Sequence, residues 1–390
     1  MIAPFSYKHF VDIEFGAGKV KEILNAVRAE HASKAMIVID KDLRKLGMMK
    51  PVTDVLDAGH VPYLLFSEFT PNPSVLSVDA CAKEIRAEGC DIIIAIGGGS
   101  SMDVGKGAAV IATNEGSIED YMYLRGDKAR KVENPLLPLI AVPTTAGTGS
   151  EVSECIVLID TKQIKDVFYD GILLPKYAYV DPEMTYGMPK SVCANTGLDV
   201  FGHALEAYVS TLENTMADLF SKEAIKLTLE YLPASVAGDK EARNYMALAS
   251  MYAGIAQSKN GCIIPHAVSC PLSARKKVPH GLGVGVAQIP TIEYTAKVSA
   301  KKYKEIIDYI DPAAASVAEE KAADFLIDKL HALFQAIGVD EKLDIGPVDE
   351  AFIDQMAGEA LLEIDIEGCP RQPVSKADLV EIYHKMLKLG

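Results

Sequence analysis

The chain has 390 residues, 49% of them apolar, and carries 54 acidic against 39 basic side chains, for a formal net charge of −15. This length exceeds what one hydrophobic core usually serves, so we expect two folded domains. The acidic balance argues against nucleic acid or an anionic membrane as a partner, and no apolar run reaches the roughly 18 residues of a membrane helix.

The cysteines bear on the compartment in which the protein works. Seven cysteines, an odd number, contain no CxxC pair. No charged and then apolar segment opens the chain. This usage predicts a reduced, cytoplasmic protein without a disulfide framework, in which most cysteines fill space in the core.

The first half alternates short apolar strands with longer helical stretches, which predicts an α/β domain with a mostly parallel sheet. In chain order, the expected elements are helix 19–28, strand 35–40, helix 49–58, strand 63–66, helix 77–88, strand 91–96, helix 103–112 and strand 137–142.

The second half changes character near Lys190, where stretches rich in Ala, Leu and Glu repeat with helical periodicity. It predicts an all-helical domain, and its clearest helices are 215–231, 241–257, 319–336 and 376–389. The turn-rich segment 180–189 marks the boundary. We therefore expect an α/β domain at 1–187 and a helical domain at 188–390.

A glycine loop follows the strand 91–96. Gly97, Gly98, Gly99 and Ser100 lead from this strand into a helix, an arrangement that brings backbone N–H groups and a helix N-terminus to an anion. The loop is not a GxGxxG sequence because Met102 stands at the third glycine position. The spacing also fails the phosphate loop of nucleotide hydrolases. Phosphate binding and a simple turn both remain open.

A second loop, 143–151, follows the strand 137–142 and is rich in threonine, glycine and serine. Ligands of open α/β sheets bind at this edge, although a capped turn has the same composition. Asp40 ends the strand 35–40, where a carboxylate can accept from a ribose 2′-hydroxyl and repel a 2′-phosphate. Asp40 therefore favours NAD over NADP, unless it only starts a turn.

Four side chains of the second half can bind a divalent metal. Asp199 and His203 stand four residues apart on one predicted helix face. His266 and His280 follow, separated by Pro271 and Pro279, so we expect them on two different elements. Carboxylate and imidazole donors without thiolate suit Fe²⁺, Mn²⁺, Co²⁺ or Zn²⁺ in a catalytic site. Each histidine taken alone could equally be an ordinary core or surface residue.

Taken together, these motifs resemble the iron-dependent (group III) alcohol dehydrogenases over nearly the whole chain. The shared segments are 15–18, Asp40, 71–73, 97–103, 143–151, 180–182 and the four metal candidates in the family's order. The resemblance implies a dinucleotide-binding α/β domain, an all-helical metal domain and a cleft between them.

The resemblance also implies residue roles. Asp40 and Asn72 would hold the adenosine side of NAD(H). Gly97, Gly98, Gly99 and Ser100 would hold the pyrophosphate, with Asp103 close by. The nicotinamide half would be lined by Thr144, Thr145, Thr148 and Lys162. Fe²⁺, which Zn²⁺ could replace, would be bound by Asp199, His203, His266 and His280.

These roles imply hydride transfer between nicotinamide C4 and a primary alcohol or aldehyde held at the metal. The family resemblance further implies a homodimer or a larger homo-oligomer. A lyase similar to dehydroquinate synthase, with NAD and metal but no net redox change, is the alternative from another class. Net NADH formation from an alcohol would separate the two.

The chain departs from the family pattern beside two of the metal candidates. Cys270 replaces a second histidine, which puts a proton relay at that position in doubt. Three cations, Arg275, Lys276 and Lys277, precede His280 where relatives mostly have apolar residues, Tyr and Asn. They favour an anionic substrate of the sulfoacetaldehyde/isethionate, 4-hydroxybutyrate or phosphonate type, with Cys270, Arg275 and Lys277 as substrate residues. The alternatives are cations that face solvent or pair with acids, and a neutral short-chain alcohol or 1,2- or 1,3-propanediol substrate.

Overall fold

The computed structural model describes residues 4–389 of the chain. Within this range the chain divides into two compact units, each described here by itself. The α/β unit comprises residues 8–145 and 149–188, and the helical unit comprises the chain from Pro189 onward together with residues 4–7 and 146–148. None of the described helices is both long and apolar enough to cross a membrane.

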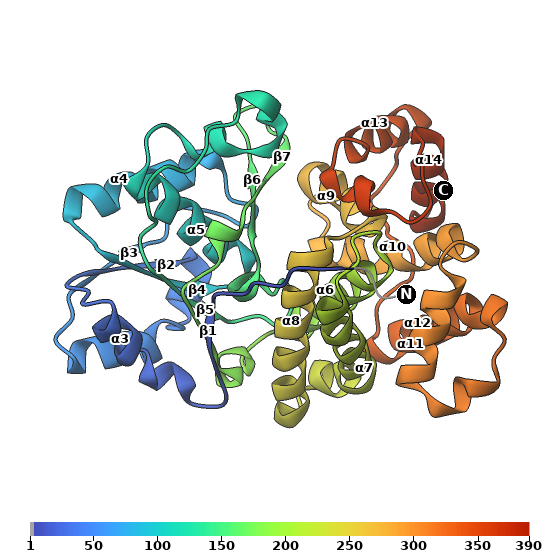
Figure 1. The fold of residues 1–390 in the computed structure, drawn as a ribbon, viewed down its shortest axis with the longest axis horizontal. Coiled ribbons are helices and arrows are strands. Elements are labelled where there is room, and N and C mark those ends of the chain that lie inside the picture. Colours follow the sequence, from blue (N-terminus) through green and yellow to red (C-terminus); the bar gives the residue numbers. More distant parts are fainter. Residues whose placement is uncertain (1–3, 390) are drawn as a thin grey trace. The chain divides into compact units, whose positions relative to one another are not determined.

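A parallel sheet forms the centre of the α/β unit (Figure 1). Among the described residues it has six strands in the order β1-β8-β5-β4-β2-β3, and each neighbouring pair is parallel. The strands are β1 (Asp12–Phe15), β2 (Ala35–Ile39), β3 (Tyr63–Phe66), β4 (Ile92–Gly97), β5 (Leu139–Pro143) and β8 (Tyr177–Val180). A separate antiparallel hairpin contains β6 (Cys155–Ile159) and β7 (Lys165–Tyr169). The predicted parallel sheet is thus confirmed.

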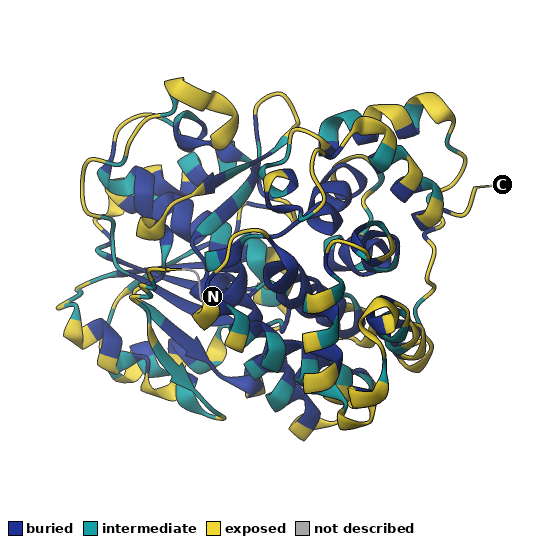
Figure 2. Ribbon diagram, turned by 45° about the vertical axis from the view of Figure 1, so that its right-hand side comes forward, coloured by how far each residue is buried: buried dark blue, intermediate teal, exposed yellow. Residues whose placement is uncertain are grey.

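The central strands form because their sequences are continuous Ile, Val and Ala runs. Every residue of β2, β4 and β5 is buried, as expected for parallel strands that are covered on both faces. Figure 2 shows the same pattern as dark blue strands flanked by helices with exposed outer faces.

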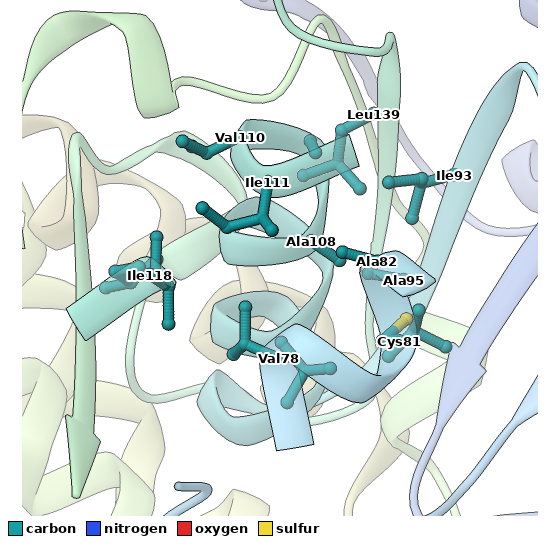
Figure 3. Packing of buried hydrophobic residues seen from close by; sticks show 14 of the residues in the cluster. Val78, Cys81, Ala82, Ile93, Ala95, Ala108, Val110, Ile111, Ile118 and Leu139 are labelled. Carbon is teal, nitrogen blue, oxygen red and sulfur yellow. The ribbon is translucent and has the colours of Figure 1, made fainter. Parts of the chain in front are cut away.

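The helices of the α/β unit are α1 (Leu24–Ala29), α2 (Lys41–Lys45), α3 (Lys50–Ala58), α4 (Val75–Glu88) and α5 (Gly99–Thr113). The predicted helix 19–28 is instead divided into a 3-10 helix, Lys19–Glu22, and α1. In Figure 3, Ala82 of α4 and Ala108 of α5 lie beside Ala95 of β4. Small side chains at these contacts let both helices pack closely on the sheet.

The strand order reverses beside β4. The chain runs from β2 outward to β3 and then returns to β4 on the other side of β2, after which β5 and β8 continue in that direction. The switch point therefore lies between the carboxyl ends of β2 and β4. Open α/β sheets bind ligands at such a point.

The helical unit consists almost entirely of α-helices, as the periodicity predicts. They are α6 (Lys190–Val209), α7 (Thr215–Ala237), α8 (Lys240–Asn260), α9 (Ile264–Lys276), α10 (His280–Thr295), α11 (Ala300–Ile310), α12 (Ala322–Ile337), α13 (Glu350–Ala360) and α14 (Lys376–Met386). Residues 197–209 of α6 are all buried, so this helix lies inside the unit. It packs mainly against α7, α8 and α10.

Candidate metal centre and cofactor loops

Three helices supply the four predicted metal ligands. Asp199 and His203 lie one turn apart on α6, His266 lies in the first turn of α9, and His280 is the first residue of α10. The expectation of two elements for the later histidines is confirmed. Pro271 lies inside α9 and does not end it. The two helices are instead separated near Pro279, since α9 ends at Lys276 and α10 begins at His280.

Asp199 is at the centre of the group. Its Oδ1 lies 3.7 Å from Nε2 of His266 and 3.9 Å from Nε2 of His280, and its Oδ2 lies 4.0 Å from Nδ1 of His203. Ligands about 2.1 Å from one metal ion stand roughly 3 to 3.5 Å apart. If the Asp199 oxygens and the histidine nitrogens moved a few tenths of an ångström closer together, their distances would match those between ligands of one metal ion.

Buried polar atoms without partners indicate that the site fits a cation. Among the described residues, Asp199 Oδ1, His203 Nδ1 and His266 Nε2 are buried and have no hydrogen-bond partner. Such atoms are costly unless a ligand satisfies them. Oxygen and nitrogen donors of this kind suit Fe²⁺ and similar divalent ions.

Hydrogen bonds select the ring nitrogen that two histidines present. Nδ1 of His266 donates to Oε1 of Glu206 at 2.9 Å, so its Nε2 faces Asp199. The hydroxyl of Ser269 donates to the carbonyl oxygen of His280 at 2.8 Å, and its oxygen accepts from His280 Nδ1 at 3.2 Å. Both rings are thereby held with Nε2 toward Asp199, as in metal sites with oriented histidines.

Sequence reasoning missed Glu206. Its carboxylate is 1% exposed and also accepts from Gln288 Nε2 at 2.8 Å and from the backbone N–H of Ile263 at 2.9 Å. Residues 199, 203 and 206 occupy one face of α6, at positions i, i+4 and i+7. That spacing is the signal that could have drawn attention to Glu206.

The electrostatics of the group favour a positive charge. Burial lowers the pKa of His266, but Glu206 and Asp199 more than reverse this and bring it to about 9. Burial lowers the pKa of His203, which forms a hydrogen bond with the backbone of Gly147. Two buried carboxylates beside neutral or protonated imidazoles make this a site that a divalent cation can neutralise.

A glycine allows His280 to reach Asp199. A Cβ at Gly281 would lie 2.1 Å from the carbonyl oxygen of Asn195 and 2.9 Å from Cβ of Asp199. Only a residue without a side chain permits α10 to approach α6 this closely. Gly281 thus determines the separation of two predicted ligands.

The glycine loop has the geometry of an anion cradle. Gly97 has φ +150°, and a Cβ there would lie 2.2 Å from Oγ of Ser101. The helix α5 begins at Gly99, and its N-cap Gly98 offers no side-chain hydrogen bond. The first N–H groups of this 15-residue helix therefore lack a side-chain cap, as a phosphate site requires.

The threonine loop lies against the glycine loop. The N–H of Thr144 donates to the carbonyl oxygen of Gly97 at 2.9 Å, and a Cβ at Gly98 would lie 3.1 Å from Oγ1 of Thr145. The Thr144 hydroxyl is buried and has no hydrogen-bond partner among the described residues. The structure thus brings the two predicted loops together beside the switch point of the sheet, where a dinucleotide fits.

Lys106, also missed, anchors the end of the threonine loop and the residues that follow it. It is 1% exposed, and its ammonium donates to Oγ of Ser150 at 3.1 Å and to the carbonyl oxygens of Ser153 at 2.9 Å and Cys155 at 3.1 Å. Buried nearby, Glu151 has a pKa raised to about 7 by burial.

The other predicted cofactor residues have varied surroundings. Asp40 Oδ1 accepts from the N–H groups of Asp42 and Leu43, so Asp40 starts the turn and caps α2. Asn72 is exposed with φ +56°, and Lys162 is exposed in the turn of the β6–β7 hairpin. Burial raises the pKa of Asp103 to about 7. Thr148 belongs to the helical unit.

The predicted substrate residues lie on α9 or at its end. Cys270 is buried. Arg275 is exposed and forms an ion pair with Glu359 of α13. Lys277 is exposed in the left-handed conformation that ends α9, and the ammonium of Lys276 lies 4.8 Å from the ring centroid of Phe352. The sequence left open whether these cations pair with acidic residues, and Arg275 does.

Two family models together match most of the chain. The model of iron-containing alcohol dehydrogenase matches residues 11–182. The C-terminal model of the Fe-containing alcohol dehydrogenase family matches residues 193–387. The chain is also 32% identical to lactaldehyde reductase of Escherichia coli over 372 residues, which cover 95% of this chain and 96% of the relative.

Solved structures show the same likeness. A 1,3-propanediol oxidoreductase aligns with a TM-score of 0.92 and 30% identity over 98% of this chain and 100% of that chain. The sulfoacetaldehyde reductase of Bifidobacterium kashiwanohense, in complex with NAD⁺, aligns with a TM-score of 0.87 and 32% identity over 99% of each chain. The chain belongs to the iron-containing alcohol dehydrogenase family and is an oxidoreductase of that family.

Proposed function

We propose that the protein interconverts a small primary alcohol and its aldehyde with NAD(H), using Fe²⁺ bound by Asp199, His203, His266 and His280. The observation that carries the proposal is the set of buried, unsatisfied donor atoms on Asp199, His203 and His266. When bound, Fe²⁺ would supply Lewis acidity at the alcohol or aldehyde oxygen, and nicotinamide C4 would supply or accept the hydride.

The protein's own residues would position the metal ligands and the cofactor. Glu206 and Ser269 hold the rings of His266 and His280 with Nε2 toward Asp199. The burial of these side chains excludes water. It thereby strengthens the attraction between the carboxylates of Asp199 and Glu206 and a cation. The N-terminus of α5 and the loop at Thr144 offer N–H and hydroxyl groups to a pyrophosphate and a nicotinamide ribose or amide.

NAD rather than NADP is the proposed cofactor. Asp40 follows β2, and its capped helix α2 packs close to the glycine loop, since a Cβ at Gly97 would lie 3.3 Å from Cδ1 of Leu43. A carboxylate here repels a 2′-phosphate. The NAD⁺ bound by the similar sulfoacetaldehyde reductase supports the same choice.

Oxidation of NADH by an aldehyde panel tests the proposal on protein loaded anaerobically with Fe²⁺. We expect turnover with NADH well above that with NADPH, and NADH formation from the matching alcohol. Asp199→Ala and His266→Ala should abolish turnover while NADH binding, measured by fluorescence, persists. Near wild-type activity in fully metal-stripped protein would contradict the proposal, and the absence of net redox change would favour the lyase.

The charge of the substrate is a finer question. We propose an anionic aldehyde of the sulfoacetaldehyde type, supported by the similar sulfoacetaldehyde reductase and by the exposed Lys277. The guanidinium of Arg275 is already paired with the carboxylate of Glu359, so the proposal depends on Lys277. The similar lactaldehyde reductase and 1,3-propanediol oxidoreductase instead favour a neutral substrate. The predicted homo-oligomer and cytoplasmic location stay predictions.

A further inference from the structure

A cysteine lies close to two of the predicted metal ligands, His203 and His266. Cys262 follows Gly261 in the short link from α8 to α9, four residues before His266, and is 6% exposed. Its sulfur and one ring nitrogen each of His203 and His266 all lie within 4.8 Å of one another. A second such group contains Asp199, His266 and His280.

We propose that His203, Cys262 and His266 form a second coordination set, which holds a thiophilic divalent ion such as Zn²⁺. Two of its donor atoms, His203 Nδ1 and His266 Nε2, are buried and have no hydrogen-bond partner within residues 4–389. Two imidazoles and one thiolate are nitrogen and sulfur donors of the kinds that Zn²⁺ takes in four-coordinate sites. The carboxylate set better suits Fe²⁺ or Mn²⁺.

The backbone around Cys262 is fixed on both sides. Gly261 ends α8 with φ +66°, and its N–H donates to the carbonyl oxygen of Gln257 at 2.8 Å. The N–H of Ile263 donates to Glu206, the same carboxylate that orients the ring of His266. Glu206 thus couples the position of Cys262 to that of His266.

The thiolate set shares His203 and His266 with the proposed iron site, so the two sites exclude one another. A metal in the thiolate set would use neither Asp199 nor His280, two of the four ligands of the proposed iron site. Binding there releases the thiol proton to solvent, so the metal replaces one proton on sulfur. Zn²⁺ would therefore compete with Fe²⁺ by moving to a different donor set, rather than by simple replacement in the same one.

Cobalt provides a direct readout, because a thiolate bound to Co²⁺ gives a charge-transfer absorption in the near ultraviolet and a carboxylate or imidazole does not. We expect this absorption in Co²⁺-loaded wild-type protein and in His280→Asn. It should disappear in Cys262→Ser and His266→Ala. Cys270→Ser is the matched control, since it changes another buried cysteine on α9 and should keep the absorption.

Affinities measured by chelator competition complete the test. Cys262→Ser should weaken Zn²⁺ binding by more than about tenfold and leave Mn²⁺ binding unchanged, which also verifies that the variant folds. Stoichiometric Co²⁺ without the absorption, or the same absorption in Cys262→Ser, would overturn the proposal. The inference shares His203 and His266 with the proposed function. Spectra and affinities report coordination alone, so its failure leaves the proposed alcohol reaction untouched.

Discussion

Glu206 accepts a hydrogen bond from Nδ1 of His266 at 2.9 Å, and both side chains are buried. The same carboxylate accepts from Gln288 and from the backbone of Ile263. A carboxylate in this position fixes the ring of a metal-binding histidine and increases its basicity. Glu206 is therefore a positioning residue for the proposed metal centre.

Glu206→Gln should weaken Fe²⁺ or Mn²⁺ binding by roughly 10- to 100-fold, because the amide keeps the shape but removes the charge that raises the basicity of His266. Chelator competition measures the affinity. The matched control is Glu305→Gln, whose carboxylate accepts from Tyr208 away from the predicted ligands. Unchanged metal affinity in Glu206→Gln would refute the positioning role.

Gly281→Ala should separate α10 from α6 and displace His280, since the new Cβ would meet the carbonyl oxygen of Asn195 at 2.1 Å. We expect metal affinity to fall by about tenfold or more and stability to fall by about 1 to 3 kcal/mol. Calorimetry of metal binding and urea unfolding measure both effects.

Gly358→Ala provides the comparison for that substitution. Gly358 also lies in a helix, α13, but a Cβ there would meet only the Lys376 side chain, at 3.6 Å. The change should leave metal binding intact and stabilise the protein by up to about 1 kcal/mol. If both glycine variants bind metal like the wild type, close helix approach is not required at Gly281.

Glu151 should make stability depend on pH. Burial raises its pKa from 4.5 to about 7, so its stabilising contribution is fully present below pH 4.5 and is lost as pH rises through 7. The free energy of unfolding of Glu151→Gln relative to the wild type should therefore rise by about 3 kcal/mol between pH 4.5 and pH 8. The attraction of the nearby Lys106 lowers the pKa of Glu151 and is already included in the value of about 7.

Urea unfolding of metal-free protein at several pH values measures this difference. The control is Glu133→Gln, at an exposed position, which should shift the unfolding midpoint by the same amount at every pH. A pH-independent difference between Glu151→Gln and wild type would show that Glu151 does not titrate in this range.

Lys277→Gln tests the charge of the substrate. If the substrate is anionic, the change should lower kcat/KM for sulfoacetaldehyde and succinic semialdehyde by about fivefold relative to propanal. Lys276→Gln should preserve the ratio, because the ammonium of Lys276 lies over the ring of Phe352. Wild-type protein that prefers propanal, with no dependence on salt, would rule out the anionic substrate.

The sequence revealed those parts of the fold whose local pattern matches their final surroundings. Strands β2 and β4 are continuous apolar runs and are fully buried, so their composition predicts them. Strand β1 is short and only partly buried, and it was missed. Helices α9 and α10 were also missed, because each contains an internal proline that tertiary packing tolerates.

Candidate ligands were easier to find than their supports. Histidine is rare in this chain, with 8 residues, so three of them near one aspartate stand out. Glutamate is common, and only its place on the helix face of Asp199 and His203 distinguishes the buried Glu206 from an exposed one. Arg275 and Glu359 are 84 residues apart in sequence, so their pairing is visible only in three dimensions.

The short segment 146–148 limits which fragments of the protein would contain a complete unit. These residues are grouped with the helical unit although they lie between β5 and β6 of the α/β unit. Gly147 in this segment forms the backbone hydrogen bond with His203. A fragment that starts at residue 189 would therefore lack one support of a metal ligand, and no single cut of the chain yields both units intact.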